Sequence, residues 1–261
     1  MRLVQPSLFK MPGRPAPTHF LCLPLVTGTS RHQLSASLSA FSADVTNPDS
    51  FAVPEQAIRP VGTLHLTIGV MSFPKDEGLE KAVTLLKTLV PRKILASARA
   101  NVSRVASTNS GQELDDTMEP PGPLSPLLPV TLKGLHSMQP SASKASVLYA
   151  PPVDTEGTLL RFCDNLRSTF QDAELIAVEN RPLLLHATIM NTIYVKGRNR
   201  KGAKRQEKLT IDARGILDRY EDFVWMENIP IEKVAICRMG AKKQEDGDEA
   251  YEVEAEIDVA Q

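Results

Sequence analysis

One short pattern, histidine-x-threonine inside an apolar strand, occurs twice in this chain and limits what the chain can fold into. The two copies are HLTIG at 65–69 and HATIM at 186–190, each within an apolar run. Side chains two positions apart on a strand share a face, so each histidine lies beside its threonine and the apolar neighbours take the other face. A single histidine in an apolar strand is more often a hydrogen-bonded core residue than a catalyst. Repetition favours a shared function for the two copies, on strands that face each other across a groove.

Two such strands side by side bring His65, Thr67, His186 and Thr188 to one cavity. Because histidine titrates near neutral pH, one imidazole can take a proton from an attacking hydroxyl or water while the other donates a proton to the leaving oxygen. Each threonine hydroxyl can donate a hydrogen bond to a non-bridging phosphate oxygen. The pattern therefore predicts phosphodiester chemistry that needs no metal and no cofactor, and it does not indicate which histidine is the acid.

Hydrophobic periodicity elsewhere indicates a mixture of helices and strands. Strands are expected at 18–25, 63–73, 130–138, 145–150, 183–195, 231–239 and 250–259, and helices at 31–45, 77–98 and 155–170. Pro91 should kink or break the second of these helices. Phe223 and Trp225 alternate with Val224 and are expected to fill the core or one face of a strand. Each half of the chain contains one motif strand with helical segments, which suggests two similar lobes.

Composition divides the chain further. Residues 1–17 contain three basic residues and no acidic one, which predicts a disordered leader, with a mitochondrial presequence as the alternative. The segment 99–129 is rich in serine, asparagine, glycine and proline and is expected to be a flexible insertion. It separates a first lobe at about 18–98 from a second lobe at about 130–261 within one phosphoesterase-like domain, 18–261.

A basic run follows the second motif at 196–208. It holds seven basic residues and one acidic residue, and its two glycines favour a loop. A solvated charged loop is the commonest meaning of such a run. The alternatives are contact with an RNA backbone and a nuclear localisation signal. The candidate RNA contacts are Lys196, Arg198, Arg200, Lys201, Lys204 and Arg205.

Overall charge and cysteine usage exclude several classes of protein. The net charge of -1 creates no global field toward nucleic acid or membrane, and no window approaches the roughly 20 apolar residues of a membrane span. Cys22, Cys163 and Cys237 are odd in number and far apart, which predicts reduced core thiols and argues against a zinc site. His19 and His136 have no matching pattern and are expected to be structural or surface residues.

Several segments together resemble a known superfamily. THFLCLPL, LHLTIGVM and LHATIMNT, in this order, are similar to the 2H phosphoesterase superfamily, which includes 2′-5′ RNA ligase-like proteins and is named for its two His-x-Thr/Ser motifs. VTLKGLHSM followed by VLYAPP, and IDARGILDRYEDF, resemble the branch that contains the A-kinase anchoring protein 7-like phosphoesterase domain and a transcriptional cointegrator subunit. The resemblance runs from about Thr18 to the end, without the insertion.

The resemblance implies a fold and a set of roles. The expected fold is α+β and bilobal, with two pseudo-symmetric antiparallel-sheet lobes and outer helices around a central cleft. His65 and His186 are expected to be catalytic, and Thr67 and Thr188 to bind phosphate, on an RNA or oligonucleotide with a phosphodiester or cyclic phosphate end. No cofactor is implied.

The same resemblance implies a cellular setting. We expect a monomer in the nucleus or cytoplasm, away from membranes, with a role in nuclear RNA processing, transcription coactivation or DNA alkylation repair and with a nuclear protein complex as a partner. The alternative function is an RNA- or nucleotide-binding adaptor subunit of such a complex that performs no turnover. A plain structural protein would require both motifs to be coincidence.

Overall fold

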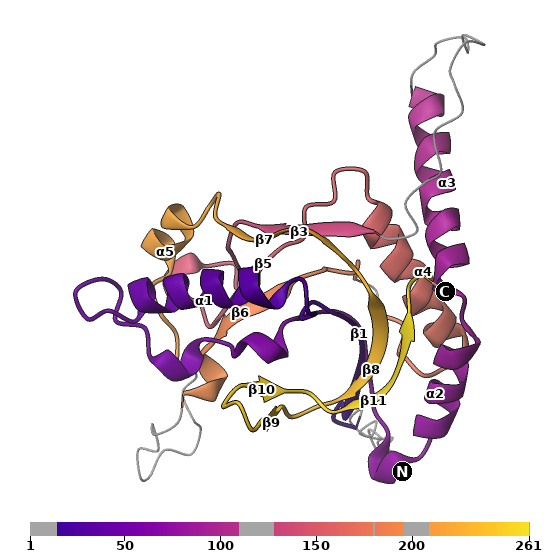
Figure 1. Cartoon of the computed structure of the whole chain (residues 1–261), viewed down its shortest axis with the longest axis horizontal. Helices are drawn as coiled ribbons and strands as arrows, with labels where there is room; N and C mark the ends of the chain where they lie inside the picture. Colours follow the sequence, from indigo (N-terminus) through magenta and orange to yellow (C-terminus); the bar gives the residue numbers. More distant parts are fainter. Residues whose placement is uncertain (1–14, 110–127, 180, 196–208, 261) are drawn as a thin grey trace, which may run out of the picture.

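The computed structural model describes residues 15–109, 128–179, 181–195 and 209–260 of the 261-residue chain (Figure 1). Its strands are β1 (His19–Pro24), β2 (His65–Met71), β3 (Pro129–Lys133), β4 (His136–Ser137), β5 (Val147–Ala150), β6 (Ala187–Asn191), β7 (Val224–Pro230), β8 (Lys233–Arg238), β9 (Lys242–Lys243), β10 (Glu249–Ala250) and β11 (Val253–Asp258). Its helices are α1 (Arg31–Val45), α2 (Leu79–Thr88), α3 (Pro91–Asn109), α4 (Thr158–Asp172) and α5 (Arg214–Arg219), with short 3-10 turns η1 (Glu55–Ala57), η2 (Val61–Thr63), η3 (Pro74–Asp76), η4 (Ala142–Lys144) and η5 (Thr192–Tyr194).

The first motif belongs to a four-stranded antiparallel sheet with the order β11-β8-β1-β2. Strands from the end of the chain thus pair with strands from its beginning, and the predicted division into consecutive lobes at about residue 130 is wrong in this respect. The reason is burial, because Phe20–Leu23 in β1 are almost completely inaccessible and a central strand needs a hydrogen-bonded partner at each edge. The strand β8, fully buried at Val234–Ile236, supplies the second partner.

The second motif belongs to a three-stranded antiparallel sheet with the order β4-β5-β6, and β3 pairs separately with β7. The two motif strands, β2 and β6, are in different sheets yet approach each other with Cα atoms within 8 Å. A bridge between Ile58 and Met190 joins the segment before β2 to β6. The fold is therefore α+β, with the two motif sheets meeting where the His-x-Thr strands lie.

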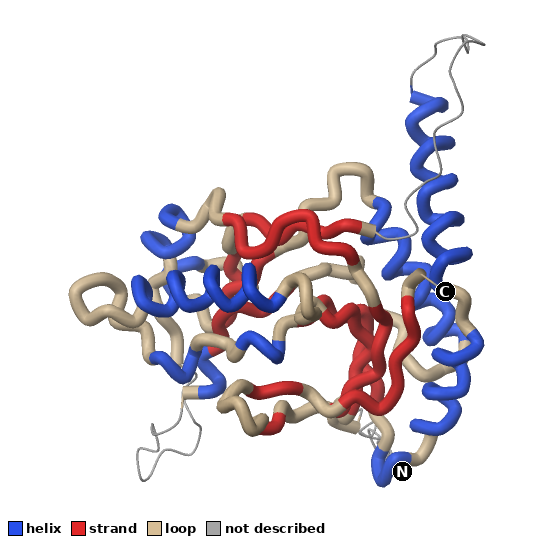
Figure 2. Tube along the Cα trace, in the orientation of Figure 1, coloured by secondary structure: helices blue, strands red, loops and turns tan. Residues whose placement is uncertain are grey.

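Helices cover the outer sides of this arrangement (Figures 1 and 2). The helix α1 packs on β7, where Phe41 and Trp225 place their ring centroids 5.1 Å apart. The helices α2 and α4 pack against β11 and β2, respectively, and α3 packs against α4. None of the helices in the described ranges has the length and apolar composition needed to cross a bilayer.

The expected helix at 77–98 is two helices, because α2 ends at Thr88 and α3 begins at Pro91, as the proline predicted. The helix α3 continues to Asn109, so the flexible insertion does not begin at residue 99. Arginine and alanine at 99, 100, 104 and 106 favour a helix and allow the backbone to continue from a docked first half, while the serine- and asparagine-rich composition indicated a loop. The rest of the predicted insertion, 110–127, lies outside the described residues, as do most of the leader, 1–14, and the basic loop, 196–208.

Candidate active site

The first His-x-Thr pair lies on β2, the edge strand of its sheet. Leu64, Leu66 and Ile68 are buried in the core, whereas His65 and Thr67 are only partly buried. This alternation is the one predicted for a strand with one core face and one polar face. The apolar face therefore anchors the strand and holds His65 and Thr67 on the opposite side.

The second pair has the same arrangement. Ala187 and Ile189 are fully buried, and His186 and Thr188 are partly exposed between them. The strand β6 begins at Ala187, so His186 stands immediately before it, and the expected strand at 183–195 is shorter than its apolar run. The Cα atoms of β2 and β6 approach within 8 Å, so the strands that carry the two motifs are neighbours.

Each histidine is anchored through the same ring nitrogen. The Nδ1 atom of His65 lies 2.8 Å from the Thr63 carbonyl oxygen, and that of His186 lies 2.9 Å from the Leu184 carbonyl oxygen. A carbonyl oxygen only accepts hydrogen bonds, so Nδ1 of each ring carries the proton. In the neutral form of each ring the lone pair is consequently on Nε2, which is the atom that faces proton transfer.

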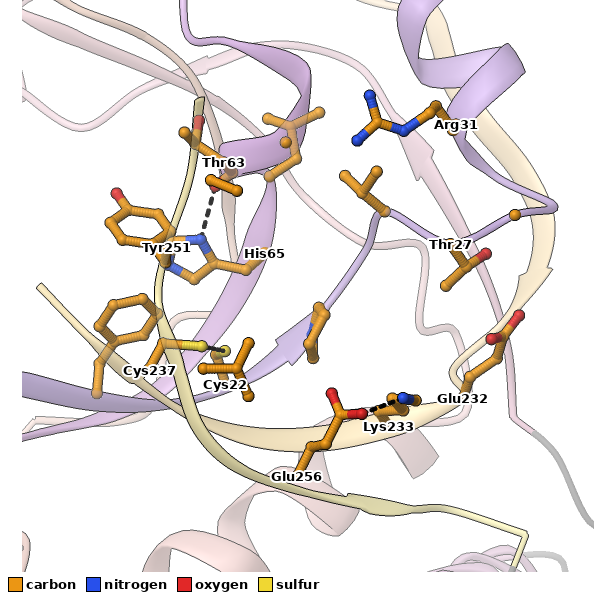
Figure 3. A pocket seen from close by; sticks show the side chains of 18 residues that line it. Cys22, Thr27, Arg31, Thr63, His65, Glu232, Lys233, Cys237, Tyr251 and Glu256 are labelled. Atoms are coloured by element: carbon orange, nitrogen blue, oxygen red, sulfur yellow. Dashed lines mark hydrogen bonds and ion pairs between the residues drawn. The ribbon is translucent and has the colours of Figure 1, made fainter. Parts of the chain in front are cut away.

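Aromatic rings hold both imidazoles in place. Tyr251 meets His65 edge-on with 5.3 Å between ring centroids, and Phe20 lies 4.7 Å from the same ring. Tyr149 meets His186 edge-on at 5.4 Å. Such edge contacts restrict ring rotation, so each Nε2 has a defined direction. Figure 3 shows the hydrogen bond from His65 to Thr63 and the position of Tyr251 beside the ring.

The surroundings of His65 disfavour its protonated form. Burial of the ring is the largest cause, and repulsion by His186 and Arg59 adds to it, against the opposing hydrogen bond to the Thr63 carbonyl. The pKa of His65 is thereby lowered from 6.5 to about 4. His65 is neutral at physiological pH, with an Nε2 lone pair that can accept a proton. The contribution of His186 also places the two motif histidines within range of each other's charge.

The hairpin β9–β10 closes one side of this site. The Asp248 carboxylate accepts hydrogen bonds from the Gly62 backbone N–H at 3.0 Å and from Arg31 at 2.9 Å. A Cβ atom on Gly62 would lie 2.5 Å from the Glu249 carbonyl oxygen, so this close approach requires glycine. The contact fixes the hairpin against η2 and places the following residue, Tyr251, on His65.

A cavity of about 420 Å³ opens beside His65 over the first sheet (Figure 3). Its volume is within the range of small-molecule sites. Cys22 and Cys237 lie in the underlying strands with their Sγ atoms 3.9 Å apart, and the rest of the lining is both apolar and polar. Of the four motif side chains expected to share one cavity, only His65 lines it. The polar lining residues are Thr27, Arg31, Thr63, Glu232, Lys233 and Glu256.

The converging motifs, the free Nε2 atoms and the fold indicate a phosphoesterase, and comparison with known families agrees. Residues 17–259 match the family model of the AKAP7 2′5′ RNA ligase-like domain. The chain belongs to this family. This is the branch of the 2H phosphoesterase superfamily that the sequence segments resembled, so the predicted family is confirmed.

Relatives of this AKAP7-like chain include two curated proteins. The uncharacterized protein C15D4.13c of Schizosaccharomyces pombe is 26% identical over 238 residues, covering 91% of this chain and 94% of that protein. Activating signal cointegrator 1 complex subunit 1 of Mus musculus is 24% identical over 172 residues, covering 61% of this chain and 41% of the mouse protein. Among solved structures, one described as a phosphoesterase superposes with a TM-score of 0.50 at 16% identity, covering 94% of this chain and 99% of its own. The α+β bilobal phosphoesterase fold is thus confirmed.

Other sequence predictions have mixed outcomes at this AKAP7-like site. His19 is completely buried and hydrogen-bonds to Thr18, so it is structural as expected. The cysteines are free and buried, as predicted. His136 is exposed and stacks on Tyr149, with 5.7 Å between the ring centroids. Tyr149 in turn contacts His186. Within the described ranges no group of three or more His, Cys, Asp or Glu residues is arranged to hold a metal ion.

Sequence reasoning missed the residues that surround the histidines. Tyr149 sits on β5, which pairs with β6, and Tyr251 lies between β10 and β11, so both reach the motif histidines only in the folded chain. Arg59 lies in an irregular segment six residues before His65, without a periodic signal. Its nearness to the first motif was the only clue available. The six candidate RNA contacts in the basic loop lie outside the described residues.

Proposed function

We propose that this protein is a metal-independent RNA phosphodiesterase or cyclic phosphodiesterase in which His65 and His186 transfer protons and Thr67 and Thr188 bind the phosphate. One observation carries the proposal. Two histidines, on β2 and just before β6, are held by the same Nδ1 hydrogen bond to a carbonyl, and the Nε2 atom of each makes no hydrogen bond to another described residue. A core histidine needs no such duplicate arrangement, whereas an acid–base pair requires it.

The lowered pKa of His65 assigns the roles in this proposal. Neutral His65 accepts at Nε2 the proton of the attacking hydroxyl or water, whose oxygen then forms the new bond to phosphorus. The bond from phosphorus to the leaving oxygen breaks, and that oxygen takes a proton from Nε2 of protonated His186. The hydroxyls of Thr67 and Thr188 donate hydrogen bonds to the non-bridging oxygens throughout. His65 then releases its proton to solvent, and His186 takes up a proton from solvent.

The substrate class follows from the family and the cavity. The family description refers to 2′5′ RNA ligase-like domains, and we propose RNA ends with 2′,3′-cyclic phosphates or 2′,5′ linkages. A cavity of about 420 Å³ beside His65 is large enough to hold the nucleoside on one side of the scissile phosphate. The basic residues of 196–208 are proposed as contacts to the flanking RNA backbone.

The cellular role is proposed from a relative. The mouse protein named activating signal cointegrator 1 complex subunit 1 is, by its name, part of a larger complex. We propose that the present protein acts as a monomer in the nucleus or cytoplasm, with a role in nuclear RNA processing, transcription coactivation or alkylation repair. A protein that binds RNA without turnover as a complex subunit is the competing function.

The test compares wild type, His65→Ala, His186→Ala and the double variant in EDTA on oligoribonucleotides that are 2′,3′-cyclic-ended, 2′,5′-linked or 3′,5′-linked. His32→Ala is the matched control, because His32 is exposed on α1. We expect one linkage class to be cleaved, and each single variant to lose at least about 10²-fold. The double variant should lose little more, since the histidines act as a unit. Binding without turnover by wild type would favour the adaptor function, and full activity of either variant would exclude the mechanism.

A further inference from the structure

Arg59 lies between the two motifs although no motif contains it. Its backbone N–H donates a hydrogen bond to the Ile189 carbonyl oxygen at 2.9 Å, and its neighbour Ile58 forms a bridge with Met190. The segment that leads into β2 is thus fixed to β6, the strand of the second motif. Arg59 is only 6% exposed.

The guanidinium group of Arg59 lies over an aromatic ring. Its Cζ atom lies 3.9 Å from the centroid of Tyr194, in the turn η5 that directly follows the second motif strand. Arg59 also interacts with residues of the first motif side. Its charge contributes to the lowered pKa of His65. Burial is the largest cause of the raised pKa of Tyr251, and Arg59 partly offsets that rise. The guanidinium group is therefore close to both motifs.

The charge of Arg59 has no acidic counterpart in the described part of the chain, where the ion pairs involve other basic residues. Its Nη2 atom is buried and has no hydrogen-bond partner there. A buried cation without a counterion, with an unsatisfied donor, lowers stability. An anionic ligand would remove both deficits, and a guanidinium group matches the geometry of phosphate oxygens well.

We propose that Arg59 is a third phosphate ligand, whose Nη2 donates a hydrogen bond to a non-bridging oxygen and whose charge offsets the negative charge that develops there during the reaction. This inference rests on the proposed phosphodiesterase function and extends it. The threonine hydroxyls are neutral donors and His186 gives up its proton to the leaving oxygen, so Arg59 supplies the positive charge that stays beside the non-bridging oxygens. Tyr194 keeps the guanidinium plane in position through the cation–π contact.

Binding separates this role from a structural one without requiring turnover. Adenosine 3′-monophosphate and adenosine are titrated calorimetrically into the wild-type protein, Arg59→Gln, Arg59→Lys and Arg214→Gln, a control in which an exposed arginine paired with Asp212 is changed. Wild type should bind the nucleotide more tightly than the nucleoside. Arg59→Gln should weaken nucleotide binding by roughly 10- to 100-fold, as expected for a charge-assisted hydrogen bond, and leave adenosine binding unchanged. Arg59→Lys should retain part of the difference, because it keeps the charge.

Several results would overturn the inference. Equal losses for nucleotide and nucleoside in Arg59→Gln would show that Arg59 only supports the shape of the cleft. Equal affinity of wild type for the two compounds would show that no phosphate is bound. If no oligonucleotide is turned over, the phosphodiesterase proposal fails while this binding comparison still decides the role of Arg59.

The pH profile is a second measurement on an active protein. Removing the positive charge of Arg59 removes one cause of the low pKa of His65. The acid limb of kcat/KM should therefore move to higher pH in Arg59→Gln and remain close to the wild-type position in Arg59→Lys. An unmoved limb in Arg59→Gln would contradict the placement of Arg59 beside the reacting groups.

Discussion

Replacing His65 by glutamine should make the stability of this protein less sensitive to acid. His65 is partly buried against Phe20 and Tyr251, and its pKa is lowered to about 4. An unfolded histidine has a pKa near 6.5, so the unfolded chain binds this proton more tightly. Below the unfolded pKa, stability therefore falls as the pH falls, until His65 is protonated in both states.

The magnitude follows from the two pKa values. A tenfold difference in proton affinity corresponds to about 1.4 kcal/mol, so the interval from 6.5 to about 4 corresponds to roughly 3 kcal/mol at the acid limit. At pH 5, where His65 is still neutral in the folded protein, the loss relative to pH 7.5 is about 2 kcal/mol. Burial raises the pKa of Asp44, but hydrogen bonds from Arg219, Tyr220 and Ser50 outweigh it and leave this pKa lowered. The hydrogen bond from Arg238 lowers the pKa of Asp76, so both carboxylates remain ionised at pH 5.

Urea unfolding at pH 7.5, 6.5, 5.5 and 5.0 measures this effect. The free energy of unfolding of wild type should fall over this range by about 2 kcal/mol more than that of His65→Gln. The comparison uses only the pH dependence, so any constant effect of glutamine on packing cancels. His32→Gln, at an exposed position, should follow wild type. Parallel curves for wild type and His65→Gln would refute the argument that burial and neighbouring charge hold His65 neutral.

Three further substitutions test the packing that supports the site. Trp225→Phe removes the buried indole N–H that donates to the Gly134 carbonyl at 2.8 Å, and should lower the free energy of unfolding by about 1–3 kcal/mol in urea titrations; an unchanged midpoint would contradict this. Leu66→Ala, on the core face of β2, should cost about 2–5 kcal/mol by the same measurement, and a cost below about 1 kcal/mol would mean that the site collapses around the smaller side chain. Gly62→Ala places a Cβ atom 2.5 Å from the Glu249 carbonyl and should displace the β9–β10 hairpin, lowering both the melting temperature and oligonucleotide turnover. Wild-type behaviour of this variant would show that the hairpin does not position the residues around His65.

Much of the secondary structure and the centre of the site were readable from the sequence. The expected helix at 31–45 is α1, the strand at 63–73 contains β2, and the proline that should break a helix stands at the start of α3. His65 and His186 each lie on the less buried face of their segment because both motifs carry the same alternation of apolar and polar side chains. Such alternation is local, since it depends only on which face of a strand is buried.

Other features depended on tertiary structure. The pairing of β8 and β11 with β1 could not be inferred from periodicity, because many strands have the same alternation and the choice of partner depends on which edge remains open. Tyr149 on β5 and Tyr251 between β10 and β11 were missed for the same reason, because they reach the motif histidines only once the strands have paired.

By itself, the sequence determined which side chains can transfer protons and bind a phosphate, because those properties belong to residue types and to the two-residue period of a strand. Only the tertiary structure decided that His65 is held neutral and that Arg59 is buried with an Nη2 donor that no described residue satisfies. The physical reason is that a pKa and an unsatisfied donor depend on the surrounding atoms, and these atoms come from distant parts of the chain.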